Sequence, residues 1–230
     1  MTVVHASNEI ATTQPIADIA AVARKHGALM HTDAAQTVGK IPTNVQQLGV
    51  DLLTVAGHKL YAPKGVGALH IREGVAIEPL IHGAACESGR RAGTENVLLD
   101  VALGAACEPA HQWIGMPYAR ELRDCLWQRL QQMFGDRIVL NGHPTLRLPN
   151  TLNVSFVGQS GSDLLAVLEG VAASTGSAYH AGAVELSPVL QALGLDPEIG
   201  MGTVRFSLGR STTRRELDAL LTLLKPFSRR

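Results

Sequence analysis

The chain has 230 residues, of which 46% are hydrophobic and 17% charged, a composition typical of a globular protein with one or two domains. Twenty basic and twenty acidic residues cancel, and no apolar run is long enough to cross a bilayer, so neither nucleic acid nor a membrane is an expected partner. Three cysteines without a CxxC pair indicate no disulfide framework and no metal site, and a reducing cytoplasm suits them.

The first third of the sequence predicts alternating strands and helices. We expect strands in four short, mostly apolar runs, at residues 2–5, 28–32, 51–55 and 68–71. Between the first two runs, apolar residues recur at helical spacing as far as Gly27, with Thr13 as the expected N-cap and Pro15 in the first turn. This order and spacing predict βαβ units, and therefore a mostly parallel sheet covered by helices.

The second half has the pattern of an α+β domain. Helix-compatible sequence runs from residue 94 to 134 with a break near Gly115, and strands are expected at 137–140, 151–157 and 204–208. One helix begins at Ser162 and keeps an apolar stripe as far as Val171. The last helix follows a capping box formed by Thr213 and Glu216. We therefore predict two domains, comprising residues 1–105 and 106–230.

Polar side chains follow the strands of the predicted parallel sheet. Asp33 and Gln36 come after the second strand, His58 and Lys59 after the third, and Asn8 after the first. Because parallel strands open their carboxyl ends onto one crevice, we expect these groups to meet there. Any one of them alone is more often a solvated residue at a strand end. An amine and a carboxylate together suit pyridoxal phosphate, whose aldehyde reacts with lysine and whose ring nitrogen pairs with a carboxylate.

Six spaced motifs resemble one known family. They include His31-Thr32-Asp33-Ala34-Ala35-Gln36 and the run that begins Gly57-His58-Lys59-Leu60, and the others lie at residues 8–16, 91–96, 147–153 and 204–210. Together they resemble the NifS-like cysteine desulfurases and selenocysteine lyases, which are class-V aminotransferases. The resemblance runs from end to end. It implies a fold-type-I pyridoxal phosphate transferase: an α/β large domain, of which residues 1–105 are the C-terminal part, and a small α+β domain.

The resemblance also implies roles for the residues around the cofactor. Lys59 is expected to form the Schiff base with pyridoxal phosphate and to shuttle the proton at the substrate α-carbon. Asp33 pairs with the pyridinium nitrogen, and Gln36 lies near the ring hydroxyl. His58 contacts the phosphate or assists proton transfer. All four positions match the family's motifs in this sequence.

Three further residues are expected to complete the site. Asn8 lies near the ring hydroxyl and reaches the substrate carboxylate, and Thr94 reaches the phosphate of a neighbouring subunit in a homodimer. Arg205 holds the substrate α-carboxylate, for which a planar, two-pronged donor is suited. The alternative for Arg205 is an ordinary salt-bridging arginine.

The sequence departs from the family at four points. Tyr179 stands where the family has the cysteine that accepts sulfur, Ala56 replaces a serine that helps to hold the phosphate, and Cys86 falls at a position usually occupied by glutamine. A phenol cannot form a persulfide. The family also has a further N-terminal segment, with the first strands of the large domain and the phosphate-cradling turn. We therefore expect the chain to be N-terminally truncated.

Two function classes follow from these observations. The first is a pyridoxal phosphate enzyme, a desulfurase or lyase acting on cysteine, selenocysteine or another β-substituted amino acid, with a sulfur-acceptor protein as a possible partner. β-Elimination needs only the lysine and the electron-accepting ring, so Tyr179 is compatible with a lyase reaction. The alternative is a catalytically inactive fragment, or a dimerisation or interaction remnant of a class-V aminotransferase.

Overall fold

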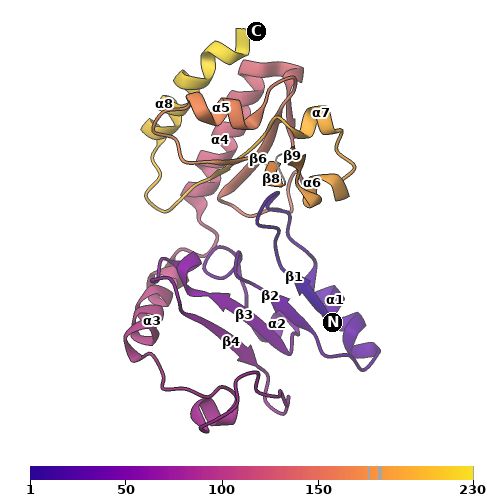
Figure 1. The fold of residues 1–230 in the computed structure, drawn as a ribbon, viewed down its shortest axis with the longest axis vertical. Helices are drawn as coiled ribbons and strands as arrows, with labels where there is room; N and C mark the ends of the chain where they lie inside the picture. Colours follow the sequence, from indigo (N-terminus) through magenta and orange to yellow (C-terminus); the bar gives the residue numbers. More distant parts are fainter. Residues whose placement is uncertain (176, 181–182, 230) are drawn as a thin grey trace. The chain divides into compact units, whose positions relative to one another are not determined.

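A computed structural model describes residues 1–175, 177–180 and 183–229 of the chain (Figure 1). It divides the chain into two compact units. The first comprises Met1–His5 and Gln14–Ile114, and the second comprises Ala6–Thr13 and Gly115–Arg230. The chain therefore passes from the first unit to the second and back within its first 14 residues.

The first unit is built on a four-stranded sheet in the order β1-β2-β3-β4, with bounds β1 Thr2–Val4, β2 His31–Asp33, β3 Leu52–Ala56 and β4 Gly67–Ile71. Strands β1, β2 and β3 are parallel, which confirms the prediction for this part of the chain. Strand β4 runs antiparallel to β3. The reason is the connection, because the tight segment 57–66 is too short for the crossover that a parallel neighbour needs.

The first unit also contains the helices α1 Ile16–Lys25, α2 Val45–Leu48 and α3 Val97–Gln112, and the 3-10 turns η1 Gly57–Leu60 and η2 Cys86–Gly89. Helix α1 buries Ile16 in a cluster that includes Met30 and Leu53. The prediction of Thr13 as its N-cap is wrong, since Pro15 occupies that position without a side-chain cap bond. Thr13 is instead held extended by a strand-like bridge to Ala6.

The second unit carries an antiparallel sheet in the order β5-β6-β10-β7, with bounds β5 Ile138–Leu140, β6 Thr151–Phe156, β7 Ser174–Thr175 and β10 Thr203–Ser207. A separate hairpin pairs β8 Ser177–His180 with β9 Ala183–Leu186. The remaining elements are α4 Pro117–Phe134, η3 Gly135–Arg137, α5 Gly161–Val167, α6 Pro188–Ala192, α7 Pro197–Gly200, α8 Arg214–Leu224 and η4 Lys225–Arg229. The mixture of helices and antiparallel strands is the predicted α+β pattern.

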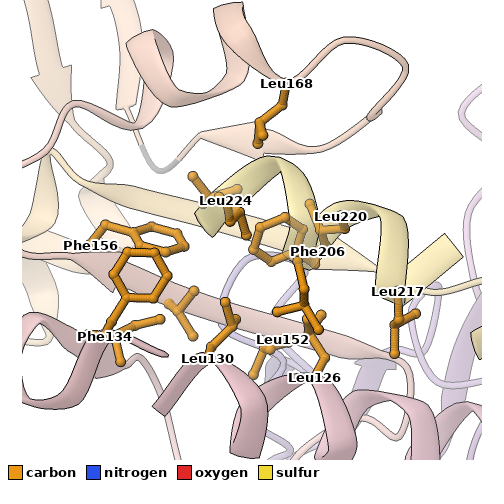
Figure 2. Packing of buried hydrophobic residues seen from close by; sticks show 14 of the residues in the cluster. Leu126, Leu130, Phe134, Leu152, Phe156, Leu168, Phe206, Leu217, Leu220 and Leu224 are labelled. Atoms are coloured by element: carbon orange, nitrogen blue, oxygen red, sulfur yellow. The ribbon is translucent and has the colours of Figure 1, made fainter. Parts of the chain in front are cut away.

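Helices α4 and α8 pack their leucines against strands β6 and β10 to form the core of the second unit (Figure 2). The rings of Phe134 and Phe156 meet edge to face, with centroids 5.1 Å apart. The predicted capping box of α8 is confirmed, with both of its hydrogen bonds present. Helix α5 ends at Val167, earlier than its apolar stripe predicts, because the chain leaves the helical conformation at Leu168, whose ψ is 71°.

The compact units differ from the predicted domains, 1–105 and 106–230, at two points. Helix α3 continues through the predicted boundary as far as Gln112, and the first unit extends to Ile114. The segment Ala6–Thr13 groups with the second unit, because side chains of that unit bind it. Asn153 Nδ2 donates to the Glu9 carbonyl oxygen over 3.1 Å, and Ser187 Oγ donates to the Glu9 carboxylate over 2.6 Å.

Among residues 1–175, 177–180 and 183–229, the structure contains no helix with both the length and the apolar character needed to cross a membrane.

Candidate active site

Strand β2 ends at Asp33, which is half-buried. Its Oδ1 accepts a hydrogen bond from the Ala35 backbone N–H over 2.9 Å, and its carbonyl oxygen accepts the His5 N–H over 2.9 Å. The side-chain carboxylate and the backbone carbonyl of Asp33 are therefore both held by hydrogen bonds within the chain. The carboxylate orientation is set before any ligand binds.

Lys59 and His58 lie on the 3-10 turn η1 directly after β3, and both side chains are exposed. The turn begins at Gly57, where a Cβ atom would lie 2.8 Å from the Val66 carbonyl oxygen, so only glycine fits. It is capped by Tyr61, whose φ of 70° is unusual for a residue with a side chain. These two backbone constraints define the turn that carries Lys59.

Asp33 and Lys59 follow adjacent strands, because β2 pairs with β3 in parallel and Asp33 lies opposite Thr54. The carboxyl ends of both strands meet at one edge of the sheet, the edge where ligands bind in open α/β sheets. The structure thus brings the carboxylate and the amine to the edge that the sequence predicts.

Lys40, which the sequence analysis did not single out, contacts the predicted site residue Gln36. Its Nζ donates to the Gln36 carbonyl oxygen over 3.0 Å and contacts the Gln36 side-chain oxygen at 3.4 Å. Burial, and to a lesser extent the positive charge of Lys59, together lower the pKa of Lys40 to about 8. Lys40 therefore contacts Gln36 and is influenced by the charge of Lys59. Its contact with Gln36 is local, four residues back, but Lys59 comes near only through the fold, so the sequence alone does not single out Lys40.

The turn that carries Lys40 packs closely on its surroundings. Gly39 has a φ of +73°, and a Cβ atom there would lie 2.8 Å from the Leu60 Cδ2 and 2.9 Å from the Ala110 Cβ. Leu60 belongs to η1 and Ala110 to α3. Gly39 therefore lets the Lys40 turn lie directly against the turn that carries Lys59.

His5 is a buried residue that binds the chain just beyond β2. It is 5% exposed, and its Nδ1 lies 3.0 Å from the hydroxyl of Thr37. That hydroxyl also donates to the Ala34 carbonyl oxygen over 3.2 Å, so it accepts its bond from the imidazole. Burial lowers the pKa of His5, which favours the neutral ring.

Asn8 and Arg205 meet within the second unit. Arg205, on β10, donates through Nη1 to the Asn8 carbonyl oxygen over 2.7 Å and through Nη2 to the Ser174 hydroxyl over 3.0 Å. Its Nε is buried and has no hydrogen-bond partner within the described part of the chain. The partners of its two terminal nitrogens are thus a carbonyl and a hydroxyl, not a carboxylate.

The remaining predicted positions lie on less regular segments. Thr94 is exposed between η2 and α3, and Cys86 is a half-buried free thiol on η2. Ala56 is the last residue of β3. The backbone of Tyr179 belongs to β8, but its side chain lies outside the described residues.

Comparison with known proteins gives a consistent result. Residues 1–220 match the family described as Aminotransferase class-V. The chain is 44% identical over 229 residues to "Cysteine desulfurase IscS" of Dictyoglomus turgidum and 46% identical over 229 residues to "Cysteine desulfurase 2" of Trichormus variabilis. Each alignment covers 98% of this chain but only 58% and 57% of the two relatives. The chain therefore spans little more than half of their length.

Solved structures agree with these sequence matches. The chain superposes on a NifS-like protein from Rickettsia africae with a TM-score of 0.89 at 27% identity, and on a second NifS-like protein with a TM-score of 0.87 at 36% identity. Both matches cover 100% of this chain and 61% of the other. They confirm the predicted fold class, that of the fold-type-I pyridoxal phosphate transferases. The family match and the fold together show that this chain belongs to the class-V aminotransferases.

Proposed function

We propose that this chain carries the part of a pyridoxal phosphate site that contains the Schiff-base lysine, Lys59, and that its chemistry is that of a cysteine desulfurase or selenocysteine lyase. One observation carries the proposal: Asp33 and Lys59 follow adjacent parallel strands in a chain of the class-V aminotransferase family. The substrate class is cysteine or a related β-substituted amino acid, in line with the relatives called cysteine desulfurases.

The donor set fits the cofactor. A primary amine, a carboxylate of fixed orientation and an amide lie at one sheet edge, and these are the groups suited to an aldehyde, a pyridinium nitrogen and a ring hydroxyl. Pyridoxal phosphate, when bound, supplies an aldehyde for amines and a ring that accepts electrons from the substrate α-carbon.

Each of the chain's own groups then has a distinct task. Lys59 supplies the amine that binds the aldehyde, and it moves the proton at the substrate α-carbon. Asp33 holds the proton on the ring nitrogen. Gln36 donates to the ring hydroxyl, and His58 contacts the phosphate or assists proton transfer. Because Lys59 and His58 are exposed on η1, both are accessible to small molecules.

The substrate carboxylate is the proposed ligand of Arg205, with Asn8 beside it. Support comes from the unpartnered Nε of Arg205 and from the closeness of the two residues. A carboxylate that replaces the Ser174 hydroxyl on Nη2 would gain the buried Nε at the same time. Thr94 is proposed to bind the phosphate in a second copy of the chain, so the active form is a homodimer.

Tyr179 favours elimination over persulfide formation, because a phenol cannot accept sulfur. We therefore prefer a lyase reaction, which needs no cysteine nucleophile. The alternative is a desulfurase reaction, in which sulfur is transferred to an acceptor protein in the cytoplasm. The same substitution also supports a second candidate function, a catalytically inactive class-V aminotransferase chain that keeps the fold for association with another copy.

Titration of the purified protein with pyridoxal phosphate tests the proposal. We expect a visible absorbance band from bound cofactor, and after borohydride reduction peptide mass spectrometry should find the adduct on Lys59. Lys59→Ala should abolish the band and the adduct, while Lys64→Ala, which removes an exposed lysine nearby, should keep both. Absence of the band in folded protein would favour the inactive chain.

A second assay separates the two reactions. Sulfide or selenide release from cysteine and selenocysteine is measured in the wild type and in Tyr179→Cys. Release by the wild type supports the lyase, whereas release that needs the restored cysteine supports an ancestral desulfurase.

A further inference from the structure

Lys40 lies beside the proposed cofactor site and has no role in the mechanism described so far. It is half-buried, and its turn is held against η1 by the close approach of Gly39 to Leu60. A buried ammonium needs partners, and Lys40 takes two oxygens from one residue, Gln36.

The chemistry of these contacts determines how the amide of Gln36 is oriented. An ammonium group can only donate hydrogen bonds, so the side-chain atom that faces Lys40 has to be the amide oxygen. The amide NH₂ group lies in the same plane on the other side of the Cγ–Cδ bond, and so points away from Lys40. Without Lys40 the amide could rotate by half a turn at little energy, since its oxygen and nitrogen have nearly the same shape.

We propose that Lys40 is a positioning residue, which holds Gln36 by its amide oxygen and so presents the amide NH₂ as the hydrogen-bond donor to the cofactor. This inference rests on the proposed function, because it assigns Gln36 to the ring hydroxyl. It adds a residue that acts through Gln36 and does not itself touch the cofactor.

The charge of Lys40 is consistent with this role. Burial and the charge of Lys59 together lower its pKa to about 8, so at neutral pH the group is still mostly the cation that binds a carbonyl oxygen well. The charge that acts on Lys40 belongs to Lys59 on η1, and the neighbour from α3 at this turn is the uncharged Ala110.

A double-mutant cycle on the full chain tests the inference. The dissociation constant and the absorbance maximum of bound pyridoxal phosphate are measured for the wild type, Lys40→Met, Gln36→Met and the double variant. We expect each single variant to weaken binding roughly tenfold, as the loss of one oriented hydrogen bond would, and to shift the absorbance maximum. The double variant should be no weaker than Gln36→Met, because Lys40 then has nothing left to position.

Three controls complete the experiment. Lys40→Arg keeps a cationic donor and should restore most of the affinity, and Lys25→Met removes an exposed lysine of α1 and should change nothing. In cofactor-free protein, the side-chain NH₂ resonances of Gln36, assigned by their loss in Gln36→Met, should move in Lys40→Met and stay in Lys25→Met.

The outcomes separate this inference from the proposed function. Equal effects of Lys40→Met with and without Gln36, or unmoved Gln36 resonances, would overturn the positioning role even if the wild type binds cofactor. A wild type that binds no cofactor would overturn the proposed function and the cofactor-presenting part of the inference. Moved resonances would then show only that Lys40 holds Gln36.

Discussion

Burial disfavours the charged form of Lys40, and this makes the free energy of unfolding of the first unit depend on pH. The ordinary pKa of a lysine, 10.5, falls to about 8 in the folded protein. One pKa unit corresponds to about 1.4 kcal/mol, so the charged Lys40 destabilises the fold by about 3 kcal/mol relative to its neutral form.

The sign follows from proton binding. Between pH 8 and 10.5 the unfolded chain keeps the Lys40 proton and the folded chain loses it, so stability rises with pH across this window. Lys40→Met has a side chain of similar length without the charge, and lacks this dependence. We therefore expect the free energy of unfolding of Lys40→Met, relative to that of the wild type, to be highest at about pH 7. This relative value should fall by about 2 kcal/mol between about pH 7 and about pH 9.5.

Urea denaturation at several pH values measures the effect, with tryptophan fluorescence as the signal. In a Trp127→Phe background the remaining tryptophan, Trp113, caps α3 and reports on the first unit. Lys25→Met in the same background is the control, since that side chain is exposed. If the difference between Lys40→Met and its background stays constant from about pH 7 to 9.5, the argument from burial is wrong.

Three further predictions concern packing and polar contacts, and urea denaturation measures all of them. Leu130→Ala empties a site with 0% exposure, so the second unit should lose about 2–5 kcal/mol, and a loss under about 1 kcal/mol would contradict the packing. Asn141→Leu removes an amide that donates to two buried oxygens at 2.8 Å, and should destabilise by about 2–3 kcal/mol; a neutral effect would mean that the network contributes nothing. Gly39→Ala should destabilise more than the control Gly27→Ala: both glycines have positive φ, but only Gly39 has neighbours within 4 Å of an added Cβ. We expect losses of about 3 kcal/mol for Gly39→Ala and about 1 kcal/mol for Gly27→Ala. Equal losses would refute the argument from close packing.

Sequence reasoning succeeded where the signal is local. The strand Thr151–Phe156 was predicted from its alternation of apolar and polar residues, and the capping box of α8 from the spacing of Thr213 and Glu216. Both signals depend only on residues close together in the sequence. The short helix α2 also has such signals, Asn44 as N-cap and Gly49 in a left-handed C-cap, but one turn is too short to show a period.

It failed where the decisive contact comes from elsewhere in the chain. Lys40 is linked to Lys59 only because Gly39 packs on Leu60, a contact between different elements. The grouping of Ala6–Thr13 with the second unit depends on side chains such as Asn153 that come far later in the sequence. Periodicity carries no information about either.

The position of Ala6–Thr13 has a consequence for how the chain is made. The Asn8 carbonyl oxygen is bound by Arg205, a residue 197 positions later. During synthesis this segment emerges long before Arg205, while the strands β1 and β2 on either side of it are already free to pair. The second unit can complete this contact only after Arg205 has been synthesised, so its folding is expected to be slower than that of the first unit.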